Sequence, residues 1–143
     1  MRKIAIVASL FAAASAGSAQ AADVTPGLWE ITLEASVSGD AGFATGPLSL
    51  RQCLTAADAR DPSRVIRPLA TPGADGCRYT ESSYSGSTFR FALDCSGTYG
   101  IRSRGSVSFG PTSFEGTMSA TVNLTGQPVD FENRISGRRV GDC

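Results

Sequence analysis

The sequence contains no histidine, and its only lysine is Lys3, close to the N-terminus. An enzymatic serine or cysteine nucleophile is usually activated by a histidine or lysine base. Histidine is also the side chain whose charge ordinarily changes between about pH 5 and 8. Residues 22–143 therefore exclude Ser-His and Ser-Lys catalysis, histidine-based metal sites and a simple pH switch.

The sequence also has no large excess of positive or negative charge. Thirteen basic and thirteen acidic side chains balance in the full chain. Without Arg2 and Lys3 the balance is eleven arginines against thirteen carboxylates, a net charge of about −2. A nucleic-acid-binding protein needs a concentrated positive surface, and no basic run occurs here. We therefore expect no nucleic-acid partner.

Long apolar runs are limited to residues 4–14, well short of the roughly 20 residues that span a membrane. A basic start precedes this run, and Ala19-Gln20-Ala21 follows it. These three parts are typical of a secretory signal. We predict a cleaved signal peptide at 1–21 and a single domain at 22–143. The expected location is the periplasm, with secretion as the alternative, and no transmembrane segment remains after cleavage.

Four cysteines are present, an even number that favours two disulfides in an oxidising compartment and allows three connectivities. A redox-active or zinc-binding set would call for C-x-x-C spacing or histidine, and neither occurs. We therefore expect no metal and no cofactor.

Residues 77–95 predict a β-hairpin with its turn at Ser85-Gly86-Ser87, where glycine accommodates a positive φ. Cys77 and Cys95 are equally distant from Gly86, so the two strands place them opposite each other. If Cys77 pairs with Cys95, Cys53 must pair with Cys143.

Alternating apolar and polar residues predict further strands at 26–37, 47–53, 99–109 and 114–124, and a last one from 129. Residues 54–60 predict one helical turn capped by Thr55, with Asp58 in a capping box. Residues 61–76 contain three prolines and two glycines without a period, which favours a long loop acting as a lid, a binding loop or a mobile segment.

These elements predict an all-β fold of about seven antiparallel strands with one short helical turn. Each strand has one apolar face, so a flat sheet would leave that face exposed to water. We therefore expect an up-and-down meander curled into a small barrel, with a two-sheet sandwich as the alternative. We do not expect an immunoglobulin domain, because Trp29 precedes every cysteine rather than lying between a disulfide pair.

Four residues are candidate ligand or partner contacts: Trp29, Glu81, Arg138 and Arg139. The hairpin register places Glu81 on the apolar side beside Phe91, unless the register shifts there. Arg138 and Arg139 should point to opposite faces of a strand. They either contact an anion or close the fold through ion pairs with Glu30, Asp142 or Glu132, and the closure is favoured. Trp29 is either a ligand platform or a core residue, with the core favoured. We assign no catalytic residue.

Several short motifs support a comparison with known sequences. They are Pro-Gly-Leu-Trp-Glu at 26–30, Gln-Cys-Leu-Thr at 52–55, Cys-Arg-Tyr at 77–79, Cys-Ser-Gly at 95–97, Gly-Thr-Met at 116–118 and Ser-Gly-Arg-Arg-Val-Gly-Asp-Cys at 136–143. Together they resemble the domain-of-unknown-function family 3617, a family of small exported bacterial proteins. The resemblance implies export and a four-cysteine framework, and it transfers no activity.

Three functions fit these residues. The first is a non-catalytic periplasmic protein that holds a small apolar ligand among aromatic side chains, in an internal cavity below the 61–76 loop. The second is an envelope protein–protein or cell-wall interaction module, which requires an exposed apolar patch or an unpaired strand edge. The third is a carboxylate-based hydrolase, which requires two carboxyl groups facing each other across a cleft.

Overall fold

A computed structural model describes residues 23–37, 44–71, 75–97 and 100–143. The predicted signal peptide at 1–21 and Tyr99 of the predicted 99–109 strand lie outside these ranges. The elements in chain order are β1 (Gly27–Val37), β2 (Ala44–Leu54), α1 (Ala56–Arg60), α2 (Ser63–Ala70), β3 (Cys77–Ser85), β4 (Thr88–Cys95), β5 (Arg102–Phe109), β6 (Ser113–Leu124) and β7 (Gln127–Gly141).

All seven strands form one antiparallel sheet in the order β2-β1-β7-β6-β5-β4-β3. Strands that follow one another in the chain are neighbours, with β2 and β3 as the one exception. β1 pairs with β7, which joins the two ends of the domain, and β2 and β3 do not pair at all. The predicted all-β, seven-stranded antiparallel fold is confirmed.

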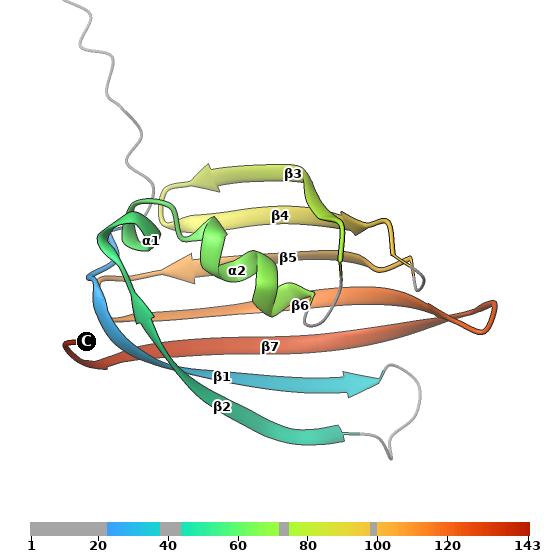
Figure 1. Ribbon diagram of the computed structural model, residues 1–143, viewed down its shortest axis with the longest axis horizontal. Coiled ribbons are helices and arrows are strands. Elements are labelled where there is room, and N and C mark those ends of the chain that lie inside the picture. The colour runs from blue at the N-terminus through green and yellow to red at the C-terminus, as the bar shows by residue number, and fades with distance from the viewer. Residues whose placement is uncertain (1–22, 38–43, 72–74, 98–99) are drawn as a thin grey trace, which may run out of the picture.

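The sheet does not close into a barrel, and it does not form a two-sheet sandwich. Closure would require β2 to pair with β3, but these strands remain the two edges. The segment between them, residues 55–71, instead carries α1 and α2 across one face of the sheet (Figure 1). We call this segment the helical connection. It covers apolar surface that barrel closure would otherwise have buried.

The helix α2 corrects the prediction of a loop over 61–76. Val65, Ile66 and Ala70 are buried against the sheet, a spacing that places them on one helical face. Pro62 precedes the first helical residue, where a missing N–H carries no cost. Pro68 lies inside the helix and removes one backbone hydrogen bond, which burial of the apolar face offsets. The prolines therefore led us to predict a loop where a short amphipathic helix forms.

The short helix α1 begins as predicted. The Asp58 backbone N–H donates to Thr55 Oγ1 at 3.2 Å, and the Thr55 backbone N–H donates to Asp58 Oδ2 at 3.0 Å. These two bonds form the capping box expected from the sequence. Asp58 accepts hydrogen bonds from the backbone N–H of Thr55 and, with a smaller effect, from its hydroxyl. Together they lower the pKa of Asp58 from its usual value.

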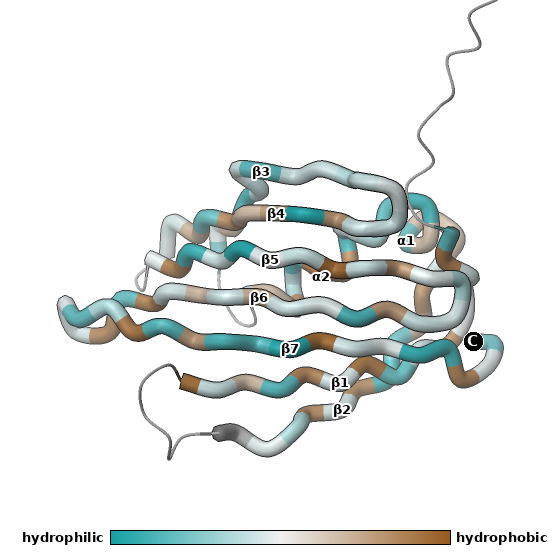
Figure 2. The backbone as a smooth tube through the Cα atoms, turned by 180° about the vertical axis from the view of Figure 1, so that it is seen from behind, coloured by the Kyte–Doolittle hydropathy of each residue, from teal (hydrophilic) through white to brown (hydrophobic). Residues whose placement is uncertain are grey.

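The hydrophobic core lies between the helical connection and the sheet. Viewed from the side away from the helices, apolar and polar residues alternate along the strands (Figure 2). The alternation directs one set of side chains toward α2, and we call this side the core face and the opposite side the polar face. The largest fully buried side chains are Trp29, Ile31, Pro62, Ile66, Phe89, Leu93, Val107, Met118 and Ile135.

Glycines on the core face allow large neighbours to lie across the sheet. Gly137 is directly opposite Phe114, and a β-carbon at Gly137 would overlap the phenyl ring. Gly116 is opposite Val107, and a β-carbon there would meet the valine side chain. These strands therefore approach more closely than two side chains of ordinary size would allow.

The β3–β4 hairpin has a tighter turn than predicted. Its loop is the two-residue Gly86-Ser87, with Gly86 at φ 59°, and Ser85 pairs with Thr88. This turn alone would shift the register by one residue, but a bulge between Tyr79 and Glu81 shifts it back. The predicted pairing of Cys77 with Cys95 is therefore confirmed.

Two disulfides join Cys77 to Cys95 and Cys53 to Cys143, with Cα atoms 4.0 and 5.7 Å apart. No cysteine in the chain is free. Cys53 is the next-to-last residue of β2 and Cys77 begins β3, so a disulfide anchors each side of the helical connection. Two disulfides indicate an oxidising environment outside the cytoplasm.

Candidate functional site

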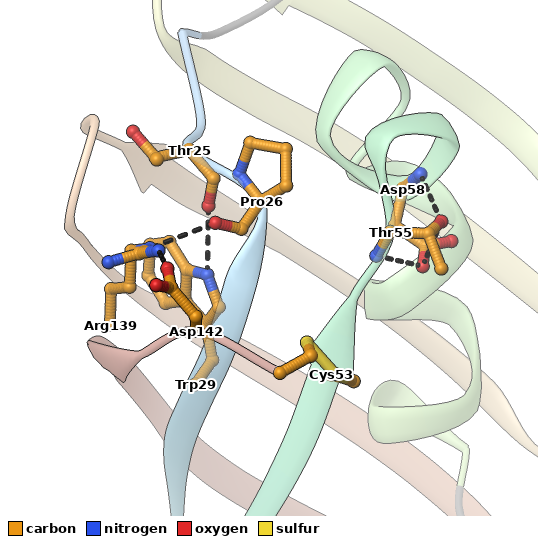
Figure 3. The surroundings of a disulfide bond; sticks show 9 residues. Thr25, Pro26, Trp29, Cys53, Thr55, Asp58, Arg139 and Asp142 are labelled. Carbon is orange, nitrogen blue, oxygen red and sulfur yellow. Dashed lines mark hydrogen bonds and ion pairs between the residues drawn. A yellow bond between two sulfur atoms is a disulfide. The ribbon is translucent and has the colours of Figure 1, made fainter.

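The two most distinctive sequence motifs, at 26–30 and 136–143, meet at one end of the sheet. β1 and β7 pair there, and the Cys53–Cys143 disulfide ties the end of β2 to the end of the chain (Figure 3). We call this group the clasp. It comprises Pro26, Gly27, Trp29, Glu30, Arg138, Arg139, Asp142 and the Cys53–Cys143 bond.

Trp29 is the buried centre of the clasp. Its side chain is 0% exposed and stacks on Phe114 with ring centroids 5.6 Å apart. The indole Nε1–H donates to the Thr25 carbonyl at 3.0 Å. Thr25 in turn donates its backbone N–H to the Pro111 carbonyl. Trp29 is therefore placed in the core, where its single polar group holds the N-terminal segment against the sheet.

Arg139 closes the other side of the clasp. Its Nε–H donates to the Pro26 carbonyl at 2.9 Å, and its Nη2 pairs with Asp142 (Figure 3). Gly27 has φ 145°, and a β-carbon there would overlap both the Gly141 carbonyl oxygen and the Arg139 guanidinium. A glycine is needed at position 27 so that the two chain ends can approach.

Arg138 points to the polar face, as expected for the neighbour of Arg139. Its Nη2 donates to Glu30 Oε1 at 2.7 Å, and Arg51 lies 3.5 Å from Glu30 Oε2. The hydrogen bond from Arg138 is the largest cause of a lowered pKa at Glu30. Both arginines thus have partners inside the chain, and the ion pairs with Glu30 and Asp142 match the closure favoured from the sequence.

Glu81 does not lie where the sequence placed it. The bulge after Tyr79 sets Glu81 opposite Ala92 rather than on the side of Phe91. Its side chain is therefore exposed on the polar face, away from the other three candidate residues. The structure groups Trp29, Arg138 and Arg139 and separates Glu81 from them.

The polar face carries shallow grooves along β4, β5 and β6. Their charged linings alternate in sign: Arg78, Arg90, Arg102 and Arg104 with Glu81, Asp94 and Glu132. Phe91 borders one of these grooves, but its side chain belongs to the core and the residue is 3% exposed, so it offers no ring on which a sugar or base could stack. This arrangement is that of a solvated surface.

The carboxyl groups do not assemble into a hydrolytic pair. Each aspartate and glutamate of the described ranges is at least partly exposed. Glu34 and Glu132 share one groove beside Arg134, but they belong to the adjacent strands β1 and β7 and lie on the same face. A glycosidase needs its two carboxyls on opposite sides of the scissile bond. The third function from the sequence therefore has no site among these residues.

An apolar surface remains on the core face beyond the helical connection. Leu48 of the edge strand β2 is 61% exposed and pairs with Leu33, which is only partly buried. Leu50 of β2 is partly buried, as are Val37 and its partner Phe131. We call these five residues the open strip. The sequence predicted their face but not their exposure, because the path of the helical connection decides which residues it covers.

Two other features bear on chemistry. Within the described ranges, no three cysteine, aspartate or glutamate side chains lie close enough together to hold a metal ion. No helix in the same ranges is both long and apolar enough to cross a membrane.

Comparison with known proteins gives one match. No curated protein and no solved structure matches the chain. The model of the family described as "Protein of unknown function (DUF3617)" matches residues 24–143. This range begins at buried Val24 and includes both halves of the clasp. The chain therefore belongs to the DUF3617 family, whose function has not been assigned.

Proposed function

We propose that the protein is a non-catalytic interaction module of the cell envelope. Its binding surface is the open strip together with the unpaired edge of β2. The carrying observation is Leu48, which is 61% exposed on an edge strand and continuous with the core through Leu33. An edge strand beside an apolar surface suits an extended apolar segment of another protein, which adds to the sheet as a further strand.

The filled core favours an interaction module over a protein that encloses a small ligand. Trp29, Ile66 and Phe89 occupy the space between the helical connection and the sheet, and each is at most 1% exposed. A ligand enclosed among the aromatic side chains would have to displace them. A partner on the open strip displaces only water, and burying a leucine side chain contributes about 1.5–3 kcal/mol.

Photo-crosslinking in intact producing cells tests the module. A photoreactive amino acid replaces Leu48 in one variant and Ser83 in the matched control. Ser83 is exposed on the other edge strand, β3. We expect a covalent protein adduct of defined mass from position 48 and none from position 83. Equal labelling at both positions, or none at 48, contradicts the proposed surface.

A small apolar ligand with a polar end is the second candidate. One observation favours it: the Ser103 hydroxyl is buried on the core face, with the residue 3% exposed, and has no hydrogen-bond partner among the residues that the structure describes. Buried hydroxyls are normally satisfied. Native mass spectrometry of protein from its own host tests this candidate through an adduct lost on denaturation. Ser103→Ala should then retain the fold and release the adduct, and a bare wild-type chain removes the candidate.

The envelope location is part of the proposal. It rests on the expected signal peptide at 1–21 and on the two disulfides. Cell fractionation followed by intact mass should find a chain that begins at Ala22 and lacks four hydrogens relative to the all-thiol form. A full-length cytoplasmic chain with free thiols contradicts it.

A further inference from the structure

The two disulfides are nested in the sequence. Cys77–Cys95 spans 18 residues and lies inside Cys53–Cys143, which spans 90. The first two cysteines along the chain, Cys53 and Cys77, are 24 positions apart (53 to 77) and are not partners. The native pattern therefore differs from pairing cysteines in the order in which they are synthesised.

Loop-closure statistics in the unfolded chain work against this pattern. The probability of contact falls with the 3/2 power of loop length. Cys53 therefore meets Cys77 about sevenfold more often than it meets Cys143. Cys77 meets Cys95 only about 1.5-fold more often than it meets Cys53. A substantial share of chains oxidised before they fold should form the Cys53–Cys77 bond.

The Cys53–Cys77 bond is incompatible with the folded structure. β2 and β3 are opposite edges of the sheet, and the end of β2 and the start of β3 lie at opposite ends of it (Figure 1). A disulfide requires Cα atoms within roughly 7 Å. Joining Cys53 to Cys77 would draw together the two ends of the helical connection, so α2 could not cross the sheet.

We infer that the native pattern is reached by thiol–disulfide exchange, and that the chain is a client of a thiol–disulfide isomerase. The partner is defined by its chemistry, a reactive thiolate presented by another protein. This inference follows from connectivity and topology. It is independent of the proposed interaction surface.

The exchange balances without net oxidation. The isomerase thiolate attacks Cys53 of a Cys53–Cys77 bond, forms a mixed disulfide with Cys53 and releases the Cys77 thiolate. That thiolate attacks Cys95 of the accompanying Cys95–Cys143 bond, which forms Cys77–Cys95 and releases the Cys143 thiolate. The Cys143 thiolate then attacks Cys53 of the mixed disulfide, forms Cys53–Cys143 and regenerates the isomerase thiolate.

Burial explains why the exchange ends at the native pattern. Cys95 is 6% exposed once the hairpin lies in the sheet, so attack on the Cys77–Cys95 bond is restricted to Cys77, which is itself partly buried. Cys53 and Cys143 are both exposed, so their bond can form last and can still be reached by a thiolate from another protein.

Oxidative refolding tests the inference. The reduced, unfolded chain is oxidised without free thiols and then given buffer or a catalytic amount of reduced protein disulfide isomerase. Bonds are mapped by alkylation, proteolysis and mass spectrometry. We expect early Cys53–Cys77 to exceed Cys53–Cys143 by about sevenfold. The isomerase should raise the rate of native pairing at least several-fold.

The matched control is the double variant Cys77→Ser/Cys95→Ser, in which only Cys53–Cys143 can form. Its oxidised form already carries the native bond, so the isomerase should leave its bond map unchanged, a readout that does not require the variant to fold. The inference is overturned if wild-type chains form Cys77–Cys95 first with only traces of Cys53–Cys77. It is equally overturned if the isomerase leaves native pairing unchanged.

Discussion

The β3–β4 hairpin and the clasp are both closed by a disulfide, but they differ in how much of the chain they require. The hairpin is complete within residues 77–95, and Cys95 is buried. The clasp joins residues from both ends of the domain across 90 residues, and its cysteines are exposed. One disulfide thus stabilises a local hairpin, and the other holds together the two ends of the domain.

The comparison also explains the distinctive motifs. Residues 26–30 and 136–143 are far apart in the chain, and the pairing of β1 with β7 brings them together in the clasp. There Gly27 permits close approach, Trp29 fills the core, and Arg138 and Arg139 pair with Glu30 and Asp142. The conspicuous residues therefore close the fold, and the open strip contains none of them.

The largest expected effect separates the two disulfides. Loop entropy assigns about 4.5 kcal/mol of folding free energy to Cys53–Cys143 and about 3 kcal/mol to Cys77–Cys95. We expect Cys53→Ser/Cys143→Ser to lose more stability than Cys77→Ser/Cys95→Ser in urea unfolding. The opposite order would show that the hairpin, rather than the clasp, controls global stability.

The next effect compares two glycines. Gly137→Ala places a methyl group against the buried Phe114 ring and should cost up to about 3 kcal/mol in unfolding free energy. Gly86→Ala in the hairpin turn meets no neighbour and bears only the strain of φ 59°, about 1 kcal/mol. Gly46→Ala, which also meets nothing, is the control and should change little. Equal losses at positions 137 and 86 would argue against close packing at Gly137.

A third prediction separates the adjacent arginines of the clasp. Arg139→Gln loses a charge-assisted bond to the Pro26 carbonyl and should cost about 2 kcal/mol at neutral pH. Arg138→Gln removes an exposed ion pair and should cost less.

The pH dependence of these two variants sharpens that prediction. The pKa of Glu30 is lowered in the folded state, so the contribution of Arg138 is present above about pH 4.5 and is lost as the pH falls through the folded-state pKa. Thermal melts at pH 7 and pH 3 should show the gap between wild type and Arg138→Gln narrowing with acid. A gap that stays constant would mean that Arg138 does not stabilise the fold through its ion pair with Glu30.

The smallest effect lies at the hairpin. Tyr79→Phe removes the hydrogen bond from Tyr79 Oη to the Ser63 carbonyl, 2.6 Å long, and should cost about 1 kcal/mol. Burial raises the pKa of Tyr79 above its usual value and that of Tyr84 to about 12. Their neutral forms therefore stabilise the fold below about pH 10, and this stability is lost as the pH rises further.

Alkaline unfolding thus tests the hairpin as acid unfolding tests the clasp. Between pH 9 and 11, Tyr79→Phe should lose less stability than the wild type, because one raised pKa has been removed. Tyr84 remains and should preserve part of the alkaline loss. Identical alkaline profiles would show that Tyr79 does not ionise with unfolding.

Prediction from the sequence succeeded where the signal was local. The Thr55–Asp58 capping box needs four successive residues, and the Cys77–Cys95 pairing needs one hairpin. It failed where two local features shift the strand register in opposite directions, as do the two-residue turn and the bulge before Glu81. It also failed at α2, because the cost of Pro68 is visible in the sequence and the burial that offsets it is not.

By itself, the sequence determined the number of strands, the apolar face of each strand and the opposition of Cys77 and Cys95 in one hairpin, because alternation and hairpin spacing act over short distances. Only the tertiary structure decided that β1 pairs with β7, that β2 and β3 remain edges and that α2 covers part of the core face. These outcomes depend on competition among surfaces for burial. The same competition leaves Leu48 exposed and the rest of the open strip partly exposed at the margin of the core.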